Sequence, residues 1–255
     1  MTGIFLLSCN SSEDKKAESK VKFSALVSQN LKGDISSVEE TPYKSDSTGK
    51  IREMDSCCIS VTEYDENGND TKSVSKDSKG NPSSESVITH HPNGLFKSVA
   101  STAKGKSTGG FETKIDDNGK TIWAGEIDSN GKAGIYYTNI TESEEGEVIG
   151  WKQFDKDSVF RQTGEATYDK HLFLSSTTKD SVGKVKNSST AKYNDKGEQT
   201  EYSYTDMTKD TVKTTVTKYT YESHDDMGNW TQRTTWNDKG KATGIVKRAF
   251  MYRKK

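Results

Sequence analysis

Tyr64-Asp65-Glu66-Asn67-Gly68-Asn69 is the stretch that decides the fold of this 255-residue chain. Its Asp-x-x-Gly pattern returns repeatedly, with Asn sometimes in first place, and its glycines recur at the spacing of a short strand plus a tight turn. The sequence therefore predicts a series of β-hairpins. Clear copies occur at Asp116 to Gly119, Asp128 to Gly131, Asp225 to Gly228 and Asn237 to Gly240.

The repeated residues have the chemistry of a tight turn. An Asp or Asn in first place accepts hydrogen bonds from backbone N–H groups two residues on, which favours a type I turn. The Gly in fourth place then adopts positive φ and forms the bulge that closes a three-residue hairpin loop. We assign this structural role to Asp65, Gly68, Asp116, Gly119, Asp128, Gly131, Asp225, Gly228 and Gly240.

The turn geometry also predicts which side chains share a face of the sheet. A one-residue change in loop length would invert every following side chain, and the three-residue loop is the one that gathers the apolar residues. It puts on one face Phe111, Ile115, Trp123, Ile127, Ile135 and Tyr137. In the last hairpin it groups Trp230, Trp236, Val246, Phe250 and Tyr252.

The composition points to a thin sheet. Hydrophobic residues make up only 29% of the chain and charged residues another 29%, which is too little apolar material for a thick core. The regularly spaced turn motifs and the aromatic residues argue against disorder. We predict an all-β chain, a long antiparallel meander of well over about ten strands that forms an open, curled sheet. The net charge of −1 gives no reason to expect nucleic-acid binding.

The N-terminus suggests an envelope location. The apolar run Ile4 to Cys9 resembles a bacterial lipoprotein signal that ends in a lipobox, where the cysteine thiol is acylated. The run is short and lacks a basic region before it, as in a truncated signal; the alternative is a chance cysteine after an apolar start. We expect residues 1–9 to be the signal, residues 10–30 a polar tether and residues 31–255 the hairpin domain. The predicted location is the outer membrane, facing outward.

The motif resembles the YD repeat of the RHS-type superfamily. Residues 224–233 and 246–252 are similar to the closing repeat of YD-repeat lipoproteins common in Bacteroidetes, and residues 31–38 resemble their start. The tyrosine that precedes the turn Asp is present at Tyr64, but His224 replaces it later and most other turns lack it. The resemblance implies antiparallel sheets that encapsulate or present polypeptides, or contact glycans. It implies no catalytic residue.

Cys57 and Cys58 fall in a predicted strand, residues 56–64. Adjacent strand residues point to opposite faces, so the two thiols suit neither one metal site nor a mutual disulfide. We predict half-buried free thiols and no disulfide framework.

No catalytic or metal-binding pattern stands out. His90, His91, His171 and His224 all fall in or beside turns, where solvent exposure is the simpler interpretation than metal binding. The acidic loop that begins at Asp65 lacks the Gly and the bidentate Glu of a calcium-binding EF-hand. We predict no enzyme activity, no metal and no cofactor. The alternatives are a polysaccharide-acting enzyme with paired carboxylates and an immunity-like or antitoxin-like partner protein.

The aromatic residues are the candidates for binding. Most should pack the sheet, but an exposed subset would form a strip for sugar rings or a partner chain. We predict a non-catalytic binding or scaffold module of the cell envelope that presents an extended sheet to a glycan or an envelope protein. The candidate ligand-binding residues are Trp123, Trp151, Trp230 and Trp236.

Lipidation at Cys9 is directly testable. Cells grown with an alkyne palmitate should label the full-length protein, because acylation of a lipobox cysteine attaches the fatty acid covalently. A Cys9→Ala variant should remain unlabelled. Unlabelled wild-type protein in the cytosolic fraction would reject the anchor.

Overall fold

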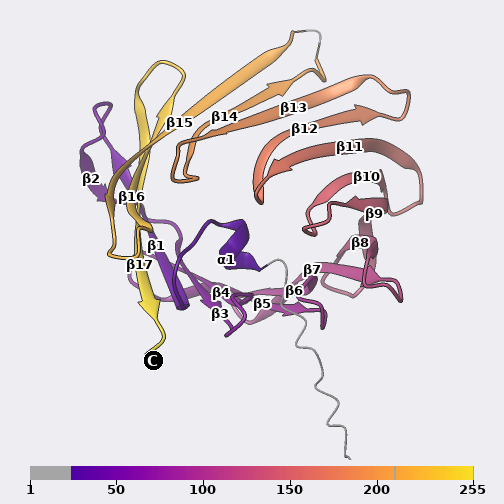
Figure 1. Cartoon of the computed structure of the whole chain (residues 1–255), viewed down its shortest axis with the longest axis horizontal. Coiled ribbons are helices and arrows are strands. Elements are labelled where there is room, and N and C mark those ends of the chain that lie inside the picture. Colours follow the sequence, from indigo (N-terminus) through magenta and orange to yellow (C-terminus); the bar gives the residue numbers. More distant parts are fainter. Residues whose placement is uncertain (1–23, 210, 255) are drawn as a thin grey trace, which may run out of the picture.

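The computed structural model describes residues 24–209 and 211–254, in which one antiparallel sheet curls around a short helix (Figure 1). Successive strands are neighbours in the sheet, as expected for a meander. The elements are α1 (Ala25–Ser28), β1 (Ile35–Ser45), β2 (Ile51–Met54), β3 (Ile59–Tyr64), β4 (Asp70–Lys76), β5 (Pro82–His90), β6 (Phe96–Ala103), β7 (Lys106–Ile115), β8 (Thr121–Ile127), β9 (Ala133–Glu142), β10 (Val148–Phe154), β11 (Phe160–Asp169), β12 (Leu172–Asp180), β13 (Val185–Tyr193), β14 (Gln199–Asp206), β15 (Lys213–His224), β16 (Trp230–Asn237) and β17 (Ala242–Tyr252).

The sheet closes into a barrel of 16 strands. β1 pairs with the last strand and with β3 at once, so that Val38 lies opposite both Phe250 and Thr62. β2 stands outside the ring and pairs only with the end of β1. The predicted all-β antiparallel meander is confirmed, but the predicted open sheet is wrong. Closure removes the two free edges that an open sheet would expose.

The hairpin loops have the geometry of a type I turn with a glycine bulge. At the first of them, Gly68 N–H donates to Asp65 O (3.0 Å) and Asp65 N–H donates to Asn69 O (2.8 Å). The Asp65 carboxylate also accepts the N–H groups of Asn67 and Asn69, at 2.9 and 2.8 Å. The φ of Gly68 is +80°. Asp116–Gly119, Asp128–Gly131, Asp225–Gly228 and Asn237–Gly240 form the same backbone hydrogen bonds.

Each of these hairpins also contains a β-bulge in the strand that follows its turn. This bulge reverses the facing of the side chains that we predicted. Ile115 lies opposite Thr121, but the next pair is Lys114 with Trp123, so β8 carries one extra residue, a β-bulge. The one-residue slip moves the following side chains to the face opposite Phe111. Such a bulge also bends and twists a strand, which helps a sheet to close. The predicted common face with Phe111 is therefore wrong for Trp123 and Ile127.

The last hairpin shows the same effect. A register shift after Trp230 leaves that residue facing the interior, whereas Trp236 faces outward. There the Trp236 Nε1–H donates to Thr220 Oγ1 (2.9 Å), and the ring packs against Gly49 of the β1–β2 turn. The predicted face shared by five residues is therefore wrong for Trp236.

The cysteine prediction is also wrong. Cys57 and Cys58 are exposed and joined by a disulfide. The strand that we placed at residues 56–64 begins only at Ile59. Because the chain bends between β2 and β3, the two side chains do not alternate across a sheet.

The main core lies where α1 meets the seam of the barrel. Leu26 packs with the buried residues Ile35, Val38 and Tyr64, and Leu26 N–H donates to Gly68 O (3.1 Å). Residues 24–30 of the segment expected to be a tether thus contain α1 and the turn that follows it, inside the ring (Figure 1). Cys9 lies outside the described residues. No helix among those residues is long and apolar enough to cross a membrane.

Gly131 isolates the contribution of the positive-φ glycine to stability. A Cβ built there meets nothing within 4 Å, yet φ is +79°, so Gly131→Ala should destabilise the fold by about 1–2 kcal/mol through backbone strain alone. Gly134→Ala, at a strand position where φ is ordinary and the nearest contacts are 3.4 Å, is the matched control and should cost nothing. Urea unfolding of both variants measures the difference, and equal stability of the two would contradict the assignment.

Candidate functional site

The barrel interior contains a cavity of about 910 Å³. Ser28 to Leu31 of α1 and the following turn form one wall, and strands from β6 round to β17 form the others (Figure 1). Because the strands run up and down, alternate hairpin turns meet at one rim, and Gly146, Gly197 and Gly228 from three of these turns line the cavity. The cavity therefore lies beside α1 at this rim.

Aromatic side chains cover much of the wall. Phe111 lies 6.2 Å from Phe96 and 6.3 Å from Tyr137, measured between ring centroids. Trp151 lies directly over Gly164, its neighbour across the strands, where a Cβ would meet the indole at 2.1 Å. The glycine thus makes room for the ring. Further round the barrel the wall continues with Tyr168, Phe173, Tyr193, Tyr221 and Trp230.

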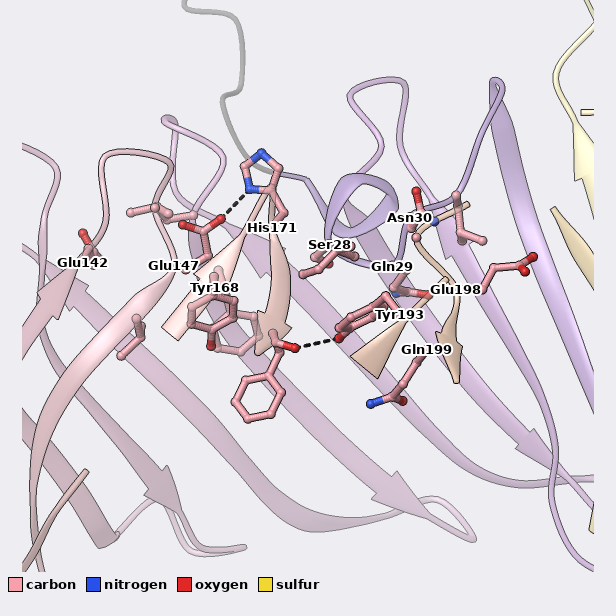
Figure 2. Close-up of a pocket in the computed structure, with 18 of the residues that line it drawn as sticks. Ser28, Gln29, Asn30, Glu142, Glu147, Tyr168, His171, Tyr193, Glu198 and Gln199 are labelled. Atoms are coloured by element: carbon pink, nitrogen blue, oxygen red, sulfur yellow. Dashed lines mark hydrogen bonds and ion pairs between the residues drawn. The ribbon is translucent and has the colours of Figure 1, made fainter. Parts of the chain in front are cut away.

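The tyrosine hydroxyls are anchored in the wall. Tyr193 donates to Phe173 O (2.9 Å) and Tyr221 donates to Gln199 O (2.7 Å), and Figure 2 shows the first of these bonds. Burial raises the pKa of both phenols, so they stay neutral donors at ordinary pH. These hydrogen bonds fix the rings as flat, uncharged surfaces.

Two buried carboxylates stand at the rim, each against a histidine. Glu147, only 5% exposed, lies with Oε1 2.5 Å from His171 Nδ1 (Figure 2), and Glu198 lies 2.5 Å from His224 Nε2. Burial alone would raise the pKa of Glu147, but hydrogen bonds from Ser143, from its own backbone and from His171 outweigh it and hold the pKa below its usual value. Each carboxylate thus connects its own turn, through Ser143 or Asn194, with a histidine of the next turn along this rim.

A buried amide at the same rim holds the chain that leaves α1. Asn229 is 3% exposed. Its Oδ1 accepts from Lys32 N (2.8 Å), and its Nδ2 donates to Lys32 O (2.8 Å) and to Tyr252 Oη (2.9 Å). From another turn, Lys196 O accepts from Asn30 Nδ2 (2.9 Å). The segment around α1 is therefore fastened to two adjacent turns of this rim.

The cavity has a cationic wall on β16 and β17. Two guanidinium groups lie close to the Trp230 ring: that of Arg248 lies 3.6 Å and that of Arg233 lies 4.9 Å from the ring centroid. Arg248 Nε also donates to Glu40 Oε1 (2.6 Å). Cations over an indole face are attracted by its quadrupole, which orders both side chains along the wall.

The four candidate tryptophans divide between the two surfaces of the barrel. Trp151 and Trp230 line the cavity. Trp123 and Trp236 are on the outer face, where the Lys114 ammonium lies 4.7 Å above the Trp123 ring. The structure thus brings together only two of the four predicted binding aromatics.

Sequence reasoning missed the polar residues of the site. Glu147, Glu198 and Asn229 each follow directly after a turn glycine, at the rim beside α1. The residue after the turn glycine does not separate the two rims in the sequence, because Lys120 occupies that position at the rim beside α1 and Asn81 at the opposite rim. Arg233 and Arg248 gave no signal either, because their facing depends on the bulges.

The arrangement offers a guest two kinds of surface. Within residues 24–209 and 211–254, no group of three or more His, Cys, Asp or Glu side chains is placed to hold a metal ion. Glu147 and Glu198 are engaged with their own turns. What remains available to a guest is a broad aromatic surface and a cationic wall.

The comparisons with known proteins concern the fold. No protein-family model matches the sequence, and no curated protein is similar to it. Among solved structures, a porin-like protein from Bacteroides uniformis has a TM-score of 0.53 at 12% identity, over 85% of this chain and 98% of that chain. A porin-like protein from Bacteroides vulgatus scores 0.36 at 11% identity, over 86% and 98% of the two chains. A TcdB2–TccC3 structure scores 0.33 at 14% identity, over 82% of this chain but 11% of that one. The first of these similarities shows a shared fold.

Proposed function

We propose that this chain is a non-catalytic binding protein of the cell envelope that holds its ligand inside the barrel. The observation that supports this most strongly is the cavity of about 910 Å³ lined by Trp151 and Trp230. Ligand sites are typically concave, roughly 300–1,000 Å³, and mostly apolar with a few placed polar groups. The predicted mode of binding, on an extended open sheet, is replaced by an interior site.

The low hydrophobic content supports a hollow barrel. A chain with 29% hydrophobic residues has little material to fill the space enclosed by so many strands. The fully buried side chains gather near α1 and the seam, and large aromatic rings further round the wall remain partly exposed to the cavity. An apolar guest would cover these rings, and that burial would supply the free energy of binding.

The envelope location rests on the N-terminal sequence. We propose that Cys9 carries a lipid anchor and holds the protein in the outer membrane, facing outward. The apolar run before Cys9 and the polar residues after it support this. The shared fold with a porin-like protein from Bacteroides uniformis is consistent with such a location.

A second surface favours a glycan or protein partner. On the outer face, Trp123, Tyr136, Phe154 and Phe160 form a row with centroid distances of 6.4, 5.4 and 5.6 Å, in which the first two pairs are stacked and the third is tilted. Flat aromatic rows suit sugar rings and extended chains. Glycan-array binding that is lost in Trp123→Ala but kept in Trp151→Ala would favour this outer row as the binding surface.

The interior site predicts which tryptophans a ligand touches. 11-Bromoundecan-1-ol has an apolar chain and a bromine atom that quenches tryptophan fluorescence at short range. It should quench the wild-type protein and the Trp123→Phe/Trp236→Phe variant. It should fail to quench the matched Trp151→Phe/Trp230→Phe variant, because of the four tryptophans only these two line the cavity.

Two results would contradict this proposal. If quenching is lost in the Trp123→Phe/Trp236→Phe variant, the binding site lies on the outer face of the barrel. No saturable quenching of the wild-type protein, together with no binding by calorimetry, would remove the interior site altogether.

A further inference from the structure

Arg233 is the residue of the cavity wall whose charge has no acidic partner. Among the described residues no carboxylate forms an ion pair with it, and its Nε is buried without a hydrogen-bond partner. The guanidinium carbon lies 4.8 and 4.9 Å from the ring centroids of Tyr219 and Trp230, and the guanidinium also forms a hydrogen bond with the Tyr221 hydroxyl. A partly buried charge without a counter-ion is costly, so this wall is suited to a ligand that supplies the negative charge.

The neighbouring arginine shows the contrast. Arg248 is neutralised by Glu40, at 2.6 Å. Burial lowers the pKa of Arg248 and the positive charge of Arg233 lowers it further, while Glu40 acts in the opposite direction. Two guanidinium groups therefore lie near the Trp230 ring, and only that of Arg248 has a carboxylate partner. An anion beside Arg233 would reduce their mutual repulsion.

The acidic side chains of the cavity stand elsewhere. Glu142, Glu147 and Glu198 are at the rim, and the last two each lie against a histidine. Arg233 lies three positions along β16 from the rim residue Trp230, within the wall. The middle of β16 is thus an electropositive part of the cavity.

The opposite part of the barrel carries an apolar surface below its rim. β8 is about half-way round the ring from β16, and around it the cavity is lined by Phe111, Ala124 and Tyr137, with Thr113, Thr121 and Glu142 towards the rim. A ligand that contacts both walls needs one negatively charged end and an apolar body. Guanidinium matches the geometry of carboxylate and phosphate oxygens by paired N–H donors.

We infer that the cavity binds an amphiphilic anion, a carboxylate or phosphate monoester on an apolar chain or ring system, with its charged head at Arg233. This inference rests on the proposed interior site and adds the chemical class of the ligand. The aromatic wall holds the apolar body, and Arg233 makes the site prefer the anion to a neutral molecule of the same shape.

The test compares 11-bromoundecanoate with 11-bromoundecan-1-ol at pH 8, where the acid is ionised. The acid should bind the wild-type protein at least about tenfold more tightly, because hydrogen bonds between ionised groups are the stronger ones. Arg233→Gln should abolish this preference, and a circular dichroism spectrum and a urea unfolding curve like those of the wild type show that the variant is folded. Arg233→Lys should keep part of the preference for the acid, since lysine retains the positive charge but lacks the paired N–H donors of guanidinium.

Arg52→Gln is the matched control, because Arg52 is exposed on β2 outside the ring. It should bind both probes as the wild type does. Competition by dodecanoate and by dodecyl phosphate, with dodecanol as the neutral reference, shows which anionic head fits better. Displacement by either anion that depends on Arg233 supports the inference.

The outcomes separate this inference from the proposed function. Equal affinity for the acid and the alcohol, or a preference for the acid that survives Arg233→Gln, would overturn the anion site and leave the interior binding site in place. Failure of both probes to bind would overturn both.

Discussion

β1 forms hydrogen bonds on both of its edges, and the rest of the architecture depends on this double pairing. Glu40 lies opposite Arg248 of β17 on one side and Ser60 of β3 on the other. The pairing joins strands from the two ends of the chain, removes both free edges of the sheet and creates an interior. The same Glu40 and Arg248 meet through their side chains (2.6 Å), so the seam of the barrel also supplies part of the cationic wall.

The repeated hairpin explains how so polar a chain can enclose a cavity. Each Asp-x-x-Gly turn is held by its own hydrogen bonds, and the bulge that follows it bends the returning strand. Curvature is thus distributed round the ring and needs little core. The aromatic residues fall into two sets, an inner wall that includes Trp151 and Trp230 and an outer row that includes Trp123. Function is proposed for the inner set because it surrounds a cavity.

The sequence was sufficient to predict the hairpins but not to predict which face of the sheet each side chain occupies. Asp116 and Gly119 identify a turn because their chemistry is local, and the strands between turns follow from spacing. The bulge at Ile122 leaves no comparable local mark, so Trp123 was assigned to the wrong face. Closure could not be read either, because the pairing of β1 with β17 joins residues more than 200 positions apart, such as Glu40 and Arg248. For the same reason the interior site and Arg233 emerged only from the fold.

Amide hydrogen exchange along β1 tests the closed barrel most directly. Exchange reports how often each backbone hydrogen bond opens, and sheet edges open far more often than interior strands. The account predicts that the β1 and β17 amides exchange at rates within about tenfold of those in β12 and β13, which lie far from the seam. Exchange of β1 and β17 that is faster by about a thousandfold or more, with β12 and β13 still protected, would show free edges and an open sheet. That result would remove the interior on which the binding site depends.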